Sequence, residues 1–165
     1  MKNYKQHYEE SVVIPANAVM LFAYLDDHSR LSSHMSKSSW MMGGGKMENF
    51  LDEGRGQKVG SHIRLTGRAF GIKIFLDEVI THYQPALQKA WETVGDLKLL
   101  VIGYYKMKFE IKPKNSESVL QVSIDYDLPQ TNIWLGYIFG KSYAKWCVRR
   151  ILKDAHGYFV ERGYN

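Results

Sequence analysis

Apolar and polar residues alternate through much of the middle of the chain. Over residues 62–68, Ile63 and Leu65 are apolar and their immediate neighbours are polar. A period of two is typical of a strand with one buried face. Comparable runs predict further strands over residues 8–14, 70–82, 87–94, 99–113 and 120–126. Short turns rich in glycine, proline or polar residues separate most of these runs, which indicates an antiparallel sheet of consecutive strands.

The last part of the chain has the period of a helix instead. From about residue 132 to residue 160 no proline interrupts the pattern, which predicts one long amphipathic helix. Its apolar stripe consists of Ile133, Tyr137, Ala144, Cys147, Val148, Ile151, Ala155 and Tyr158. Gly136 and Gly140 lie on the same stripe, where small residues let a helix approach a sheet closely or leave space beneath it. Lys145, Arg149, Lys153 and His156 form the opposite face.

Two short helices are expected between the first strand and the rest of the sheet. Pro15 suits the first turn of a helix, because its missing N–H is not needed there. Apolar residues predict a buried helix over residues 16–25 and a second one over residues 29–35. Taken together, the elements predict an α+β fold, in which a curved antiparallel sheet wraps around the long C-terminal helix.

Composition narrows the class of protein. The length of 165 residues fits a single domain covering residues 1–165. Hydrophobic residues make up 45% and charged residues 24%, close to globular averages, which argues against a disordered chain. The lone cysteine, Cys147, excludes a disulfide-rich scaffold and a cysteine-based metal site. No apolar run is long enough to span a bilayer and no secretory signal pattern opens the sequence, so we expect a cytoplasmic protein.

The net charge of +5 is mildly basic, with a pI of about 9.2. Much of the excess lies near the C-terminus, where Asp154 and Glu161 oppose a larger group of cations. These cations are Lys141, Lys145, Arg149, Arg150, Lys153 and Arg162. A solvated helix face explains the excess, and peripheral contact with an anionic membrane is the alternative. Nucleic acid is not an expected partner, because the charge is modest and the sequence contains no recognised nucleic-acid motif.

Catalytic and metal-binding motifs are missing from the sequence. Gly140-Lys141-Ser142 lacks the preceding glycine that a phosphate-binding loop requires, and it falls within the predicted helix. Ser142-Tyr143-Ala144-Lys145 matches a Ser-x-x-Lys pattern without its companion motifs. The six histidines do not have metal-binding spacing. We therefore predict no metal ion and no cofactor, and the sequence identifies no catalytic residue.

The chain is rich in aromatic residues and methionine, with 11 tyrosines, 7 phenylalanines, 4 tryptophans and 7 methionines. Core packing accounts for most of them. Several tyrosines nevertheless lie on the predicted inward faces, and a buried hydroxyl without a partner costs roughly 1–3 kcal/mol. Two interpretations therefore stay open: close packing, or a cavity whose walls these side chains form around a small molecule.

The residues predicted to line such a cavity come from the inward faces of the strands and from the helix. They are Ile63, Leu65, Trp91, Gly103, Tyr105, Met107, Phe109, Ile124, Tyr126, Tyr143 and Cys147. Trp40, Met41 and Met42 precede three consecutive glycines and are predicted to form the entrance, with packing of the loop itself as the alternative. Methionine suits this position, because its side chain adapts to ligands of different shape.

Five segments of the sequence are distinctive. They are VVIPA at residues 12–16 with FAYLDD at 22–27, GRGQKVGS at 54–61, KAWET at 89–93 and IDYDLP at 124–129. Together they resemble the START-like superfamily, also called SRPBCC or helix-grip, and in particular its polyketide cyclase/dehydrase-like bacterial members. The resemblance covers nearly the whole chain. It implies the helix-grip fold, with a deep cavity between sheet and helix that different members use for lipids, quinones, polyketides and other apolar molecules.

A fold does not fix a function, and three functions agree with the sequence. The first is binding, transport or sequestration of an apolar or aromatic small molecule in the cavity. The second is an enzyme of the polyketide cyclase/dehydrase type, which needs a polar residue with a displaced pKa in that cavity. The third is a lipid or quinone carrier that docks on anionic membranes through Trp134, Leu135 and the helix lysines. The sequence predicts neither a particular ligand nor an oligomeric state.

Overall fold

The computed structural model describes residues 3–31 and 45–163 of the chain. The predicted entrance residues Trp40, Met41 and Met42 lie outside these ranges, as does the end of the second predicted helix. Within the described residues, no helix is long and apolar enough to cross a membrane.

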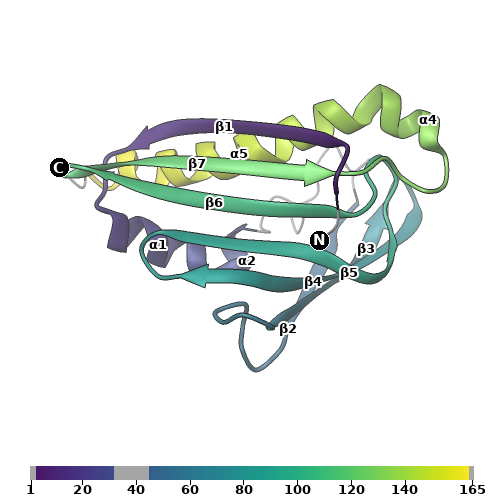
Figure 1. Cartoon of the computed structure of the whole chain (residues 1–165), viewed down its shortest axis with the longest axis horizontal. Helices are drawn as coiled ribbons and strands as arrows, with labels where there is room; N and C mark the ends of the chain where they lie inside the picture. Colours follow the sequence, from purple (N-terminus) through teal and green to yellow (C-terminus); the bar gives the residue numbers. More distant parts are fainter. Residues whose placement is uncertain (1–2, 32–44, 164–165) are drawn as a thin grey trace.

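Seven antiparallel strands form one sheet in the order β1-β7-β6-β5-β4-β3-β2 (Figure 1). The strands are β1 (Gln6–Ile14), β2 (Met47–Leu51), β3 (His62–Ala69), β4 (Ile72–Gln84), β5 (Gln88–Lys98), β6 (Tyr105–Lys114) and β7 (Glu117–Tyr126). Strands β2 to β7 follow one another as a meander, and β1 closes the order by pairing with β7. The predicted antiparallel sheet is therefore confirmed, and the long chain excursion between β1 and β2 contains the short helices.

Those helices are α1 (Ala18–Asp26) and α2 (His28–Leu31). Helix α1 begins two residues later than predicted, because Asn17 caps it: the Asn17 side-chain oxygen accepts a hydrogen bond from the Met20 amide at 3.0 Å. Pro15 lies before the helix and not within its first turn. Helix α1 packs against β6 and β7 and against the C-terminal helix.

The predicted long helix is confirmed as three consecutive segments: α4 (Ile133–Leu135), the π-helical turn η2 (Gly136–Gly140) and α5 (Lys141–Glu161). Helix α5 packs along β1 and β7, and α4 lies at the end of the sheet away from the C-terminus (Figure 1). The buried stripe of α5 consists of Ala144, Cys147, Val148, Ile151, Leu152, Ala155 and Phe159. It covers the apolar face of the sheet, as the periodicity predicts for α5. Ile133 and Tyr137, predicted on the same stripe, are instead exposed, because Gly136 and Gly140 face the protein at the helix start.

Two glycines let the start of this helix approach its neighbours closely, as expected. A Cβ atom on Gly136 would lie 2.4 Å from Cδ of Pro129, and one on Gly140 would lie 3.0 Å from the carbonyl oxygen of Val101. A larger residue at Gly136 would have to displace the proline ring. The contacts fix the helix start against the segments that precede β6 and follow β7.

Three sequence predictions about the strands are wrong. Strand β2 was not expected, because its five residues show little alternation. The strand predicted over residues 87–94, with a turn expected at Gly95-Asp96, continues as β5 to Lys98, and its register against β4 shifts there as in a bulge. The strand expected from Leu99 begins at Tyr105, because the backbone of Gly103 bonds instead to Asp127, its amide lying 2.7 Å from the Asp127 carbonyl oxygen.

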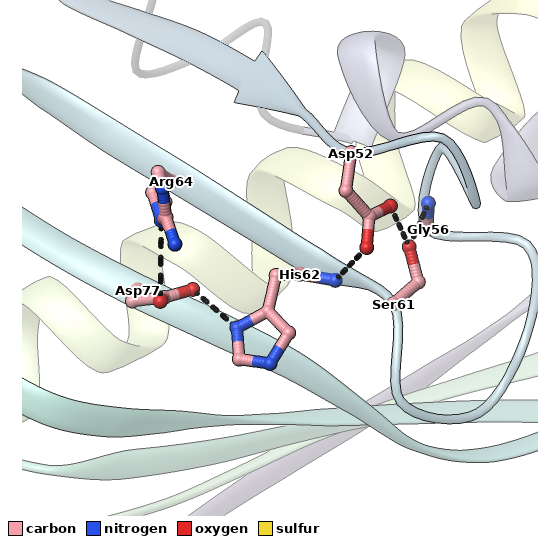
Figure 2. Close-up of polar contacts among 6 residues, drawn as sticks. All are labelled: Asp52, Gly56, Ser61, His62, Arg64 and Asp77. Atoms are coloured by element: carbon pink, nitrogen blue, oxygen red, sulfur yellow. Dashed lines mark hydrogen bonds and ion pairs between the residues drawn. The ribbon is translucent and has the colours of Figure 1, made fainter.

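A carboxylate organises the connection between β2 and β3 (Figure 2). Asp52 accepts hydrogen bonds from the Ser61 hydroxyl at 2.5 Å and from the His62 amide at 2.7 Å. Ser61 in turn accepts a bond from the Gly56 amide at 2.7 Å. These hydrogen bonds hold the pKa of Asp52 below its usual range, and the bond from the Ser61 hydroxyl has the largest effect. The segment 54–61, part of the family resemblance, is therefore a structured turn whose polar groups bond one another.

Candidate ligand-binding site

The concave face of the sheet, beneath the C-terminal helix, brings most of the predicted lining residues together. Trp91, Met107 and Phe109 are buried there, and Phe109 has edge-to-face contacts with Trp91 and with Phe22 of α1. The other buried members are Ile63, Leu65, Tyr105, Ile124, Tyr126 and Cys147. These side chains form part of one continuous apolar core. Their contact with a ligand stays a prediction.

A polar cluster lies within this apolar surface. Tyr105 of β6 donates a hydrogen bond from its hydroxyl to the carboxylate of Glu78 on β4. Tyr143 and Cys147 of α5 lie one helical turn apart, within hydrogen-bonding reach of each other, and both lie close enough to Tyr105 to affect its pKa. Four titratable groups from the sheet and the helix therefore converge between the two layers.

Burial keeps the hydroxyl and thiol groups of this cluster protonated. It raises the pKa of Tyr105 well above the ordinary value, and the negative charge of Glu78 raises it further. Burial is also the main cause of the raised pKa of Tyr143, and it raises the pKa of the Cys147 thiol to about 12. At neutral pH the cluster therefore offers proton donors around one carboxylate.

A small cavity adjoins the cluster where Tyr143 meets the turn between β3 and β4. Its volume is about 40 Å³, and it is lined by Ala69, Phe70, Ile74, Leu99, Leu100, Val101, Ile102 and Tyr143. This volume holds a water molecule but not a drug-sized ligand. Part of its wall is the irregular segment 99–104, which belongs to no strand, and another part is Phe70, which is largely exposed.

A buried ion pair anchors helix α1 to the same face of the sheet. The Lys89 ammonium, fully buried, lies 2.9 Å from Oδ1 of Asp26 and 3.3 Å from the Asp26 carbonyl oxygen. The Tyr83 hydroxyl donates to Oδ2 of Asp26 at 2.7 Å. Burial lowers the pKa of Lys89, while the Asp26 carboxylate opposes that shift. Each charged oxygen of Asp26 thus has a donor.

Known structures place this arrangement among familiar folds. Ara h 8.0201 is 17% identical over 94% of this chain and 98% of its own, with a TM-score of 0.66. The Zhui aromatase/cyclase from Streptomyces sp. R1128 is 16% identical over 91% and 93%, with a TM-score of 0.58. A START superfamily protein from Mycobacterium smegmatis is 14% identical over 94% and 97%, with a TM-score of 0.57. The chain has the START-like, helix-grip fold.

At these identities the likeness concerns the fold alone. No protein-family model matches the chain, and no curated protein sequence matches it. The likeness nevertheless confirms the helix-grip fold that the resemblance seen in the sequence implies. This fold also explains why the strand faces and the helix stripe, although distant in sequence, meet between the two layers of the molecule.

Gly103 departs from its predicted place in the helix-grip fold. It precedes β6, and a Cβ atom there would lie 2.5 Å from the Leu128 carbonyl oxygen. Its lack of a side chain therefore serves the close approach of two backbone segments. Tyr143, in contrast, lies on the wall of the small cavity, and its contact with a ligand stays a prediction.

Sequence reasoning missed three charged residues of the helix-grip interior: Asp26, Glu78 and Lys89. Alternation along β4 contains the signal for Glu78, which follows the inward residues Ile74 and Leu76 at a spacing of two. Lys89 shares a face with Trp91, so its inward direction could also be predicted. The described residues contain no group of His, Cys, Asp and Glu side chains that could hold a metal ion.

Proposed function

We propose that the chain binds an apolar or aromatic small molecule that carries a polar group, between the concave sheet face and the C-terminal helix. The observation that carries this proposal is the polar cluster of Glu78, Tyr105, Tyr143 and Cys147 inside an otherwise apolar layer. Binding sites for small molecules combine apolar walls with a few polar groups that orient the ligand. Protonated Tyr143 would donate to a ligand carbonyl or hydroxyl.

The ligand needs more room than the cavity of about 40 Å³ provides. We infer that it enters by displacing segment 99–102 and the tip of the β3–β4 turn, which form the cavity wall together. Phe70 and Gly71 at that tip both adopt positive φ, and segment 99–104 makes no strand pairing. Wall segments outside the sheet move without breaking its ladder of hydrogen bonds.

The test uses N-phenyl-1-naphthylamine, an apolar probe that fluoresces in dry surroundings. We expect the wild-type protein to bind it and Ala69→Leu to weaken binding by tenfold or more, because the larger side chain fills the cavity. Ala23→Leu is the matched control, since Ala23 is exposed on α1 and lines a separate groove with Tyr24 and Tyr158. Equal loss in both variants, or no binding by the wild type, would contradict the proposal. Native mass spectrometry of the purified protein gives an independent check for a co-purified apolar molecule.

A second candidate is an enzyme of the cyclase/dehydrase type acting at the same place. The specific observation in its favour is the hydrogen-bonded pair of Tyr105 and Glu78, because a phenol beside a carboxylate is able to transfer a proton to or from a bound ketone. Replacing Tyr105 by Phe separates the two functions. A carrier would keep its probe affinity within about tenfold, since one hydrogen bond is worth roughly 0.5–1.5 kcal/mol.

An enzyme with this pair would instead lose about 100-fold or more in turnover when the Tyr105 hydroxyl is removed. The reaction to monitor is loss of water from a polyketone thioester, followed by mass spectrometry. Tyr104→Phe is the control, because the Tyr104 hydroxyl donates to the Gly95 carbonyl oxygen at 2.8 Å on the exposed side of the chain. No turnover by the wild type leaves binding as the function.

A further inference from the structure

Large apolar side chains cluster on the surface at the start of the C-terminal helix. Five of them have exposed fractions between 50% and 72%: Ile133, Trp134, Tyr137, Ile138 and Phe139. We call these five residues the helix-start patch. Single exposed apolar residues are ordinary, but a contiguous group of this size marks a surface that contacts an apolar partner.

The exposure of the patch follows from how the helix start is held. Gly136 packs against Pro129, and Gly140 packs against the backbone of Val101. The two smallest residues of this segment therefore face the protein, and the large ones point away from it. Residues Gly136–Gly140 form a π-helical turn, in which hydrogen bonds join residues five apart. The small residues therefore face the protein at both ends of this turn. The side chains of the patch are therefore not core residues that the rest of the protein fails to cover.

A cationic surface continues from the patch along α5. An open groove of about 370 Å³ is lined by Ser142, Lys145, Trp146, Arg149, Arg150 and Lys153. Arg149 pairs with Glu10 at 2.8 Å and Arg150 with Asp154 at 3.1 Å. No carboxylate in residues 3–31 and 45–163 forms an ion pair with Lys145 or Lys153. The groove therefore carries excess positive charge beside an aromatic side chain.

We propose that the helix-start patch inserts into the interfacial layer of an anionic membrane, while Lys145 and Lys153 contact lipid headgroups. Tryptophan and tyrosine prefer the boundary between hydrocarbon and headgroups, where their rings and polar atoms both find suitable surroundings. Lysines beside an apolar helix surface add attraction to anionic lipid, which falls off within a Debye length. Trp134 and Tyr137 provide the first component, and Lys145 and Lys153, further along the same helix, provide the second.

Charge favours the membrane over a second copy of the chain. A second copy of the chain carries the same net positive charge, and contact between like charges is unfavourable. An anionic bilayer instead complements the cations. The proposal does not rest on ligand binding in the interior, so each can fail without the other.

The experiment is flotation of the protein with vesicles of phosphatidylcholine alone and of phosphatidylcholine mixed with phosphatidylglycerol. We expect binding to the mixed vesicles, weakened by salt, and little binding to the neutral ones. The double variant Trp134→Ser/Ile138→Ser is expected to lose at least tenfold in affinity, because two large apolar side chains no longer insert. Lys145→Gln is expected to lose about fivefold.

Two control variants test whether these losses of vesicle affinity are specific to the patch and to Lys145. Val160→Ser removes an apolar side chain with 52% exposure at the other end of α5, and Lys114→Gln removes an exposed lysine of the β6–β7 hairpin. Both are expected to bind as the wild type does. The patch residues and Lys114 are exposed and Lys145 is partly exposed, so variants at these positions should keep the wild-type thermal unfolding temperature, which checks that they fold.

Tryptophan fluorescence adds a signal from the patch itself. Mixed vesicles should shift the emission of the wild type to shorter wavelength, and Trp134→Phe should bind the vesicles without that shift. The proposal is overturned by equal binding to neutral and mixed vesicles, by no binding at all, or by patch variants that bind normally. Self-association that depends on the patch, with no vesicle binding, would identify the patch as a protein interface and also overturn it.

Discussion

At the scale of single residues, Cys147 gives the sharpest consequence of burial. Its thiol has a pKa of about 12 in the folded chain against an ordinary value of 9.0, because burial disfavours the thiolate and Glu78 adds to this. The contribution of the protonated thiol to the free energy of unfolding is fully present below pH 9.0 and is lost as the pH rises towards 12. Replacing Cys147 by Val should make the free energy of unfolding fall less steeply with pH above 9.0.

Urea unfolding at a series of alkaline pH values measures this slope. Tyr105 and Tyr143 also have raised pKa values, so part of the slope should remain in the variant. A thiol-reactive disulfide such as dithiodipyridine provides a second measurement: at pH 8 it should label the unfolded chain rapidly and the native chain slowly. An unchanged slope together with rapid native labelling would mean that the thiol is accessible.

The sequence pattern predicted which side chains point inward better than it predicted which of them are charged and paired. Alternation placed Trp91, Met107 and Phe109 on the inward face, and all three are buried there. The same rule contains the directions of Glu78 and Lys89, yet a charged residue inside a sheet is expected only where a partner exists. Asp26 becomes the partner of Lys89 across 63 positions of sequence, and no local pattern specifies that contact.

At the scale of elements, replacing glycine by alanine should change stability in opposite directions at the two ends of the C-terminal helix. Gly136→Ala should destabilise the protein, because the new Cβ would lie 2.4 Å from the Pro129 ring. Gly157→Ala should stabilise it by about 0.5–1 kcal/mol, since nothing lies within 4 Å of a Cβ there and alanine favours a helix over glycine. Urea unfolding of the two variants compares them directly, and a loss of stability in both would show that Gly157 also has a packing role.

The joint between α1 and the sheet rests on the buried pair of Asp26 and Lys89. Replacing Asp26 alone by Leu leaves a buried ammonium without its carboxylate, which should cost about 3–5 kcal/mol of unfolding free energy. The double variant Asp26→Leu/Lys89→Met removes both charges and should recover most of that loss. Lys108→Met is the surface control, because its pair with Glu110 is partly exposed and is worth less than about 1 kcal/mol.

A double-mutant cycle in urea measures the coupling between the two residues. If the double variant is no more stable than Asp26→Leu, then the geometry of the pair and not its charge balance holds α1 in place.

The elements themselves were predictable where one period persists over many residues. The terminal helix and the paired strands β6 and β7 meet that condition, and their two-residue loop Asn115-Ser116 contains the positive φ that such a hairpin requires. Strand β2 has only five residues, and its pairing with β3 is specified by tertiary contact. The end of β5 was predicted too early for a related reason. A glycine such as Gly95 is typical of a turn, and it does have positive φ, but here it lies in a bulge within the strand.

At the scale of the whole molecule, the cavity and the helix-start patch lie at the same end of the sheet. Tyr143 on the cavity wall follows the patch by one helical turn, and Gly140 between them packs against Val101, another wall residue. Figure 1 shows α4 at this end, away from the C-terminus. A membrane bound by the patch would therefore lie next to the segment that we expect to open.

This arrangement predicts a division of roles between two variants. Transfer of N-phenyl-1-naphthylamine from mixed phosphatidylcholine and phosphatidylglycerol vesicles to the protein should be about tenfold slower for Trp134→Ser/Ile138→Ser, matching its loss of vesicle affinity. Its probe affinity without vesicles should equal that of the wild type, because the patch does not line the cavity. Ala69→Leu should behave in the opposite way, floating with vesicles normally but binding the probe weakly. Wild-type transfer rates in the patch variant would mean that the probe reaches the interior through water, and that membrane contact serves some purpose other than loading.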